Sequence, residues 1–478
     1  MSRLRLWLSR HRWFAGVLAA GAVLRVVTML GYRPALWFPD SYSYVVTALR
    51  PRPDLVRPAG YSMFLRLFEP FHSFGVVALA QHVLGLAVGV LVYATARRLG
   101  AARWVATLAS VPVLLDAYQI QLEHLLVSDT LFMFLVVAAV CLALSRPGRR
   151  IRWRTAGAIG LLVAAATLTR TVGQPLLVII AGWLLARGSV LGAHADPRRE
   201  SRDRAVRAGV MLAAAVVPLL AYGGWFYATY QRAGLVGANG VFLYARTMAF
   251  ADCGVMRPPP DLAVLCDPRP PAQRPPSQEY VWALDSPLVV LPDITFSRDN
   301  DALAGRFASL AIRSQPLDYA ASMLSELGRT FEWGRPVYPD QEIYDYYQFP
   351  SETPAPPGRH PAQRGVELAR EYERGEIWTR VTEPFGVLMR GYQHVARLPG
   401  AVLLAVLLVP PVVAAVRWVR RRQAGRMSWT LPWLCSWVLV VMPPAVAEFD
   451  YRYVLPVVPL ACLAAAVAAA RERPPAER

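Results

Sequence analysis

Residues 37–61 read WFPDSYSYVVTALRPRPDLVRPAGY and come shortly after an apolar run at residues 13–31. The stretch holds a carboxylate, Asp40, directly after a proline and surrounds it with tyrosines and arginines. Charged groups are costly to bury beside a bilayer. An acid grouped there with cations and phenols is therefore not explained by structural needs alone. The stretch therefore predicts a polar site at the outer end of the first membrane span.

Apolar residues make up 55% of the 478 residues, whereas soluble domains are usually about 45–50% apolar. The excess gathers in runs whose length approaches the roughly 20 residues that a helix needs to cross a bilayer. The fold class predicted from this pattern is an all-α polytopic membrane protein with about ten transmembrane helices and one mixed extracytoplasmic domain. The runs lie at residues 13–31, 74–96, 104–117, 131–144, 155–168, 174–185, 208–227, 401–416, 429–446 and 454–470.

The formal net charge is +18, a value that on a soluble protein would suggest binding to nucleic acid. Here the arginines cluster between apolar runs, and basic loops remain on the cytoplasmic side of a membrane. We therefore expect a multi-pass cell-membrane protein with no nucleic-acid partner and with cytoplasmic N- and C-termini. The apolar run at 13–31 is interpreted as a retained signal anchor.

The positions of the spans predict three parts. An N-terminal transmembrane module, 1–229, holds spans one to seven and a first outer loop at 32–72. About 165 residues without a span follow, too many for a loop, so 230–397 is predicted to be a folded extracytoplasmic domain with helices near 301–314 and 316–331. Spans eight to ten lie in 398–478.

Cys253 and Cys266 lie close together in the polar middle of the chain. A disulfide between them is expected in an oxidising compartment, and two free thiols are the alternative. The sequence contains no CxxC motif and no Cys/His spacing typical of a metal site.

Several ionisable residues lie at the predicted outer ends of spans, where the charge rule does not favour arginine. Such charges can pair with one another, but several loops that bring charges to one membrane face predict a polar pocket at its outer boundary. Asp40 and Asp129 could instead be helix caps, and Arg452 could pair with Glu448 or Asp450. The ionisable residues are Arg57, Arg170, Arg452, Asp40, Glu123, Asp129, Glu448 and Asp450.

This placement suits a sugar carried on a polyprenyl phosphate, whose phosphate lies at the interface and whose sugar lies outside. Arginine binds phosphate bidentately and stays charged. A carboxylate within hydrogen-bond reach can remove the proton from an acceptor hydroxyl as that hydroxyl attacks the sugar. By analogy with inverting glycosidases, one such base with the acceptor on the opposite face of the sugar gives inversion.

On these residues, the chain resembles the GT-C superfamily of polyprenyl-phosphate-sugar-dependent glycosyltransferases. Within it, the chain looks closest to protein O-mannosyltransferase-like, aminoarabinose transferase-like and arabinofuranosyltransferase-like members. The similar pieces, in order, are FPDSYSY (38–44), RPAGYSMFL (57–65), LLVSDTLFMFL (125–135), ATLTRTVGQP (166–175) and DYRYVLPVVP (450–459).

The resemblance implies a catalytic acid in the first outer loop, matched by Asp40, and a second acid that is either Asp129 or Glu123. It implies that Arg57 and Arg170, with Arg452 as a possible third, bind the donor phosphate. Oligosaccharyltransferase relatives use a paired acidic motif with a divalent metal, whereas Ser41 follows Asp40 here. We therefore expect no metal and no other cofactor. The predicted substrate-binding residues are Tyr44, Tyr61, Trp333 and Tyr453.

The segment LYARTMAFADCG (243–254) is similar to membrane proteins of high-GC Gram-positive bacteria. Such bacteria use decaprenyl-phosphoryl arabinofuranose or polyprenyl-phosphoryl mannose as donors. The resemblance thus implies transfer of an arabinofuranosyl or mannosyl group to an extracytoplasmic acceptor of the cell envelope. The rival hypotheses are a transporter or flippase of lipid-linked sugars and a non-catalytic protein of envelope assembly.

Overall fold

A computed structural model describes residues 9–145, 150–186, 197–352, 360–420 and 427–470. Helices dominate, because a bilayer leaves no water to satisfy an open backbone, and the all-α prediction is confirmed. Apolar helices coincide with the predicted runs to within a few residues for most spans. They are α2 (Arg12–Gly31), α5 (Phe74–Arg98), α6 (Arg103–Leu115), α8 (Asp129–Ala143), α9 (Trp153–Thr169), α10 (Gln174–Ala186), α11 (Pro197–Tyr230), α21 (Gly400–Val419), α22 (Thr430–Val446) and α24 (Val458–Ala468).

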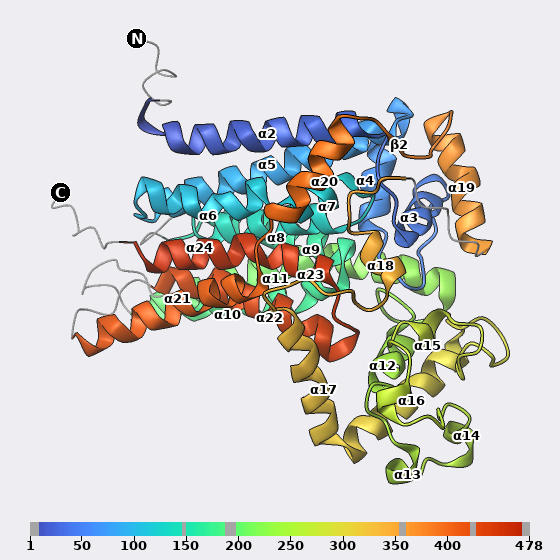
Figure 1. Ribbon diagram of the computed structural model, residues 1–478. Helices are drawn as coiled ribbons and strands as arrows, with labels where there is room; N and C mark the ends of the chain where they lie inside the picture. The colour runs from blue at the N-terminus through green and yellow to red at the C-terminus, as the bar shows by residue number, and fades with distance from the viewer. Residues whose placement is uncertain (1–8, 146–149, 187–196, 353–359, 421–426, 471–478) are drawn as a thin grey trace.

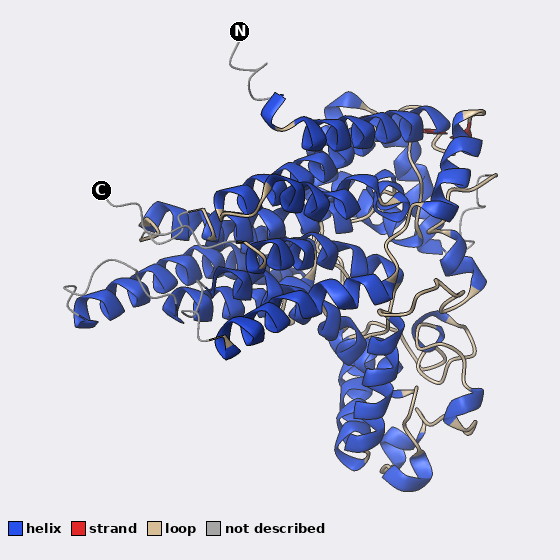
Figure 2. Cartoon of the chain, turned by 60° about the vertical axis from the view of Figure 1, so that its left-hand side comes forward, coloured by secondary structure: helices blue, strands red, loops and turns tan. Residues whose placement is uncertain are grey.

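Five spans in the described residues are long and apolar enough to cross a bilayer: α2, α5, residues 200–230 of α11, α21, and residues 451–468 that end in α24. A sixth forms if α6 and α7 (Ala117–His124), bent by 49°, count as one span. The shorter apolar helices are 129–143, 153–169, 171–186 and 430–446. They lie side by side with the longer spans in Figures 1 and 2.

The first outer loop contains α3 (Pro39–Leu49) and α4 (Gly60–Phe68), at the end of the bundle away from both termini (Figure 1). Helix α19 (His360–Glu373) packs on α3, and a Cβ atom at Gly365 would lie 2.4 Å from the Cβ atom of Tyr42. Only glycine allows the two helices to approach this closely.

The same loop is joined to distant residues by a small sheet. Strand β1 (Tyr32–Arg33) pairs antiparallel with β2 (Arg380–Val381), and α20 (Phe385–Val395) packs on α2. The C-terminal part of the 230–397 region therefore covers the first outer loop. Helix α18 (Gln341–Asp345) belongs to this part.

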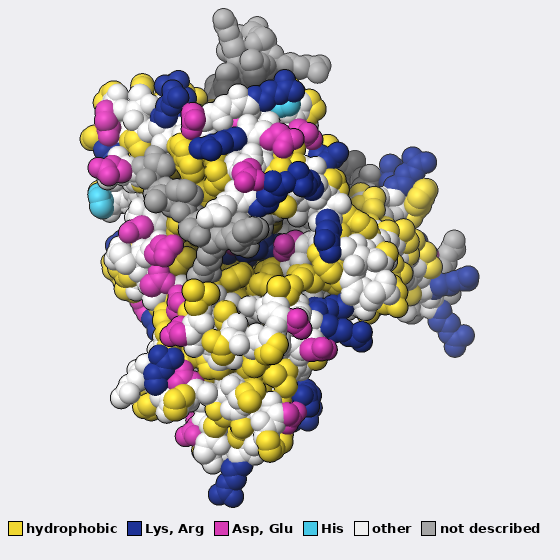
Figure 3. All heavy atoms as spheres, turned by 90° about the vertical axis from the view of Figure 1, so that its right-hand side faces the viewer, with side chains coloured by type: hydrophobic (Ala, Val, Ile, Leu, Met, Phe, Trp, Pro, Cys, Tyr) yellow, Lys and Arg dark blue, Asp and Glu magenta, His cyan; other side chains and the backbone are white. Residues whose placement is uncertain are grey.

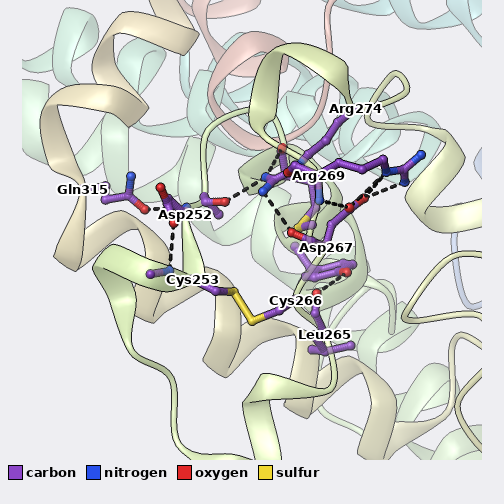
Figure 4. Close-up of a disulfide and its surroundings, with 12 residues drawn as sticks. Asp252, Cys253, Leu265, Cys266, Asp267, Arg269, Arg274 and Gln315 are labelled. Carbon is purple, nitrogen blue, oxygen red and sulfur yellow. Dashed lines mark hydrogen bonds and ion pairs between the residues drawn. A yellow bond between two sulfur atoms is a disulfide. The ribbon is translucent and has the colours of Figure 1, made fainter.

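Residues 239–329 form a separate lobe beside the bundle (Figure 1). Its helices are α12 (Asn239–Thr247), α13 (Cys253–Met256), α14 (Pro260–Ala263), α15 (Glu279–Trp282), α16 (Arg298–Ser314) and α17 (Pro316–Arg329). Helices α16 and α17 match the predicted 301–314 and 316–331. A disulfide joins Cys253 to Cys266 (Figure 4). Between 230 and 397 the described residues contain β2 as their only strand, where a mixed domain is predicted.

Candidate functional site

Asp40 lies between two arginines that come from opposite ends of the chain. It is the second residue of α3, and its Oδ1 atom accepts a hydrogen bond from Arg57 in the loop before α4. Its Oδ2 atom accepts a hydrogen bond of 3.0 Å from Nη1 of Arg452, in α23 (Tyr451–Val454). The fold therefore brings one acid and two guanidinium groups together.

Asp129 and Arg170 form the second pair of the site. Asp129 is the first residue of α8, and Arg170 immediately follows α9. Nη1 of Arg170 donates to Oδ1 of Asp129, while Oδ2 of Asp129 is buried and has no hydrogen-bond partner among the described residues. The free oxygen leaves this carboxylate able to accept one further hydrogen bond.

Tyr453 connects the two pairs. The guanidinium carbon of Arg170 lies 4.6 Å from the centre of the Tyr453 ring, and that of Arg452 lies 5.3 Å from it. Arginine over an aromatic face is attracted by the ring quadrupole, so Tyr453 holds two cations near each other. We call Asp40, Asp129, Asp450, Arg57, Arg170 and Arg452 the acid–arginine cluster.

The helix-cap alternatives for the two acids are wrong. Helix α3 begins at Pro39, and the backbone N–H of Phe38 donates to Oγ of Ser41 at 3.0 Å, so Ser41 rather than Asp40 satisfies that end. The N-cap residue of α8 is Ser128, and Asp129 is the first residue inside that helix. Asp40 and Asp129 thus bind arginine instead of capping a helix, whereas Asp450 also caps α23 by accepting from the N–H of Arg452 at 3.1 Å.

Arg452 is paired with Asp450 as well as with Asp40. Nε of Arg452 lies 3.1 Å from Oδ2 of Asp450, and the hydroxyl of Tyr347 donates to the same oxygen at 2.7 Å. Asp450 therefore sets the direction of the Arg452 side chain. The sequence marks Asp450 only as a pairing partner, and Tyr347 only as one ring of an aromatic stretch, because nothing local reveals a contact across 103 residues.

The cluster combines buried and accessible side chains. Asp40 and Arg57 keep 13% and 17% of their side-chain surface exposed, whereas Asp129 has 0%. Burial alone would raise the pKa of Asp40, but the charges of Arg57 and Arg452 outweigh burial and hold that pKa well below its usual range. The same pairing raises the pKa of Arg57. Asp40 is therefore ionised, and solvent reaches it.

The predicted substrate-binding residues are only partly brought to the cluster. The Tyr44 hydroxyl donates to Oγ of Ser128 at 3.1 Å, and the Arg57 guanidinium lies 6.0 Å from the Tyr44 ring. Tyr61 packs edge-on behind Tyr44, at 4.8 Å, and is fully buried. Trp333 is 68% exposed, and no ring contact in the described residues joins it to the cluster.

Glu123 lies in a different and fully buried network. It accepts hydrogen bonds of 2.7 Å from Nε and Nη2 of Arg25 and lies 3.0 Å from Nδ1 of His82. A Cβ atom at Gly85 would lie 1.9 Å from Glu123, so the site is closely packed. Of the two candidates for the second acid, the fold brings Asp129 and not Glu123 into the cluster.

The end of the molecule away from the termini is shown in Figure 3, which has a hollow between its upper part and the lobe below. Acidic and basic side chains lie at the margin of this hollow (Figure 3).

Among the described residues, no three His, Cys, Asp or Glu side chains are grouped so that they could hold a metal ion. Both oxygens of Asp40 already accept from arginine, so this donor set does not fit a divalent cation.

Residues 68–232 match the family model of dolichyl-phosphate-mannose-protein mannosyltransferase. This segment is similar to a GT-C family. The similarity predicted from the sequence is thus confirmed for the part of the chain that carries Asp129 and Arg170. Asp40, Arg57 and Arg452 lie outside the matched residues. No curated protein matches the chain.

Solved structures with similarity to the chain include two glycosyltransferases. The S. cerevisiae protein O-mannosyltransferase Pmt1-Pmt2 complex bound to the sugar donor is 17% identical over 50% of this chain and 36% of that chain, with a TM-score of 0.36. The oligosaccharyltransferase AglB from Archaeoglobus fulgidus, in complex with an inhibitory peptide and a dolichol-phosphate, is 14% identical over 97% and 50%, with a TM-score of 0.45. The chain spans half or less of the length of these proteins.

Proposed function

We propose that this chain is a GT-C-type membrane glycosyltransferase. It moves an arabinofuranosyl or mannosyl group from a polyprenyl-phosphate donor to an extracytoplasmic acceptor, with inversion and without a metal. The observation that supports this proposal most strongly is the meeting of Asp40 with Arg57 and Arg452 at a partly exposed position. The match of residues 68–232 to a mannosyltransferase family supports the same reaction class.

In the proposed mechanism, the donor phosphate binds to the guanidinium groups of Arg57 and Arg170. Arginine in a site with little water stabilises the negative charge that develops on a leaving phosphate. Asp40 then loses part of its pairing with Arg57, and its pKa rises toward the range of an effective general base. Asp40 removes the proton of the acceptor hydroxyl as that oxygen bonds to the anomeric carbon and the bond to the phosphate breaks. Donor binding thereby activates the base.

Asp129 and Tyr453 have supporting roles in this proposal. Asp129 orients Arg170 and retains one free oxygen that can accept a hydrogen bond from the sugar or the acceptor. Tyr453 keeps Arg170 and Arg452 beside each other while the phosphate is bound. The three arginines and their acids thus form one preorganised anion site.

The proposed orientation places both termini in the cytoplasm and the cluster outside. Both termini lie at one end of the bundle, and the first outer loop and the lobe lie at the other (Figure 1). The disulfide of the lobe supports this orientation, because disulfides persist in oxidising compartments.

The test is turnover of a radiolabelled polyprenyl-phosphate sugar by the purified chain in lipid. We expect Asp40→Asn to lower kcat by about 10²–10⁴-fold, the usual contribution of a general base, while the donor still binds. We expect Arg57→Lys and Arg170→Lys chiefly to raise the KM for the donor, because lysine keeps the charge but loses the bidentate geometry.

Asp261→Asn is the matched control, because Asp261 pairs with Arg306 on the exposed surface of the lobe. Melting temperatures of all variants exclude unfolding as the cause of lost turnover. Wild-type turnover by Asp40→Asn, or movement of labelled lipid across the bilayer without transfer, would contradict the proposal and favour the scaffold or the flippase.

A further inference from the structure

Helix α17 runs across the direction of the spans. In Figures 1 and 2 it extends away from the side of the bundle, with the rest of the lobe on its side away from the termini. Its C-terminal end is fixed at the outer end of α21, because the N–H of Gly400 donates to the carbonyl of Glu332 at 2.9 Å. The helix therefore leaves the bundle where α21 begins, which is the level where the hydrocarbon region ends if α21 spans the membrane.

The polar side of α17 contacts the lobe and the loops above the bundle. Oγ of Ser322 accepts a hydrogen bond of 2.8 Å from Arg246 of α12. Glu326 accepts from the Tyr338 hydroxyl at 2.8 and 2.9 Å and from the N–H of Phe449 at 3.0 Å. This side is thus occupied by protein.

The opposite side of α17 is apolar and largely uncovered. At 100° per residue, Leu317 and Leu324 point away from Ser322 and Glu326, and Ala320, Ala321 and Leu327 flank them. Leu317 is 82% exposed and Leu324 is 59% exposed. Covering this apolar strip with an apolar partner would be favourable.

The position of the strip indicates which partner. Helix α17 packs on α22, and α21 and α22 carry further exposed apolar residues, such as Leu408 and Leu434, which face lipid if these helices span the membrane. Trp333, 68% exposed, follows the end of α17, and tryptophan is enriched where hydrocarbon meets headgroups. Amphipathic helices with one apolar side lie in this plane with that side in the acyl boundary.

We propose that α17 is an interfacial helix whose Leu317 and Leu324 side chains insert into the outer leaflet of the membrane. The apolar side of α17 then contacts lipid. Its polar side holds the lobe against the loops that carry Glu448 and Tyr338. This proposal depends on membrane insertion and not on the glycosyltransferase activity, so either can fail without the other.

The test uses nitroxide labels on the full chain in phospholipid nanodiscs. Leu317→Cys and Leu324→Cys probe the apolar side. Asp318→Cys and Ser325→Cys are matched controls at exposed positions on the border between the apolar side and the side that contacts the lobe. The background variant replaces the free cysteines Cys141, Cys435 and Cys462 by alanine and keeps the disulfide. All four labelled positions are at least partly exposed, so the substitutions should not unfold the chain, and elution as a single species verifies this.

We expect labels at 317 and 324 to collide more often with oxygen than with a water-soluble nickel chelate, and labels at 318 and 325 to show the reverse. Equal access of the nickel chelate to all four labels would overturn the proposal. Dipolar coupling between labels at 317 on two chains in one nanodisc would overturn it too, because a second copy of the chain would then cover the strip.

Discussion

At the scale of single residues, the number of hydrogen bonds that a carboxylate already accepts decides whether it can also bind a substrate. Asp129 pairs with one arginine and keeps a free oxygen, whereas Glu123, nearby in sequence, is saturated by Arg25, His82 and Gln119. A saturated and fully buried carboxylate holds a structure together but has no lone pair to offer a substrate. We therefore assign Glu123 to the stability of the bundle.

Glu123→Gln should destabilise the protein by about 3–5 kcal/mol, because it leaves the charge of Arg25 buried without its partner. Chemical unfolding of the purified protein in detergent measures this loss. The double variant Arg25→Met, Glu123→Leu removes both charges and should recover much of the stability. An unchanged unfolding midpoint for Glu123→Gln would contradict the structural role.

At the scale of elements, a pair of acids joins α17 to the segment between α22 and α23. The Tyr338 hydroxyl lies 3.0 Å from Oε1 of Glu448 and also contacts Glu326. Burial, and next the charge of Glu326, raise the pKa of Glu448 from 4.5 to about 7. We therefore expect the junction between lobe and bundle to respond to pH.

The sign of the effect follows from proton binding. Glu448 loses its proton near pH 4.5 in the unfolded chain but near pH 7 in the folded chain, so between these values the folded state binds more protons. The contribution of Glu448 to stability is then largest below pH 4.5 and falls as pH rises toward 7. We expect Glu448→Gln to flatten the decline in melting temperature between pH 5 and 8. Glu376→Gln, at an exposed position, is the control, and equal slopes for wild type and Glu448→Gln would contradict the assignment.

At the scale of the whole molecule, the chain has two chemically different ends. The termini lie at one end, and the cluster, the first outer loop and the disulfide lobe lie at the other (Figure 1). The free cysteines Cys141, Cys435 and Cys462 are all buried. Reagents that cannot cross the membrane can therefore report which end faces outward.

In intact cells, treatment with an impermeant reductant should expose two thiols to an impermeant maleimide. These thiols are Cys253 and Cys266, so the double variant Cys253→Ser, Cys266→Ser should remain unlabelled. A mass shift per chain measures the labelling. Labelling that requires permeabilised cells would place the lobe in the cytoplasm and reverse the proposed orientation.

The helices of this protein could be predicted from the sequence more completely than its site. The apolar runs at 13–31 and 74–96 became α2 and α5 almost residue for residue, because the need of a buried backbone to bond internally acts within each segment. The candidate site residues Arg57, Arg170 and Arg452 could be named as arginines at the predicted outer ends of spans, and Asp40 as an acid among arginines and tyrosines. Their pairing could not be predicted in this way.

The sequence by itself determined that the chain is a bundle of apolar helices and which ionisable residues lie near the ends of its apolar runs, since length, hydropathy and charge are local properties. Only the tertiary structure decided that Asp40 meets Arg452 across 412 residues, that Asp129 rather than Glu123 joins the cluster, and that α17 leaves an apolar side open. These outcomes depend on how helices pack against one another. Packing is set by the shapes of many side chains at once, and no single stretch of sequence contains that information.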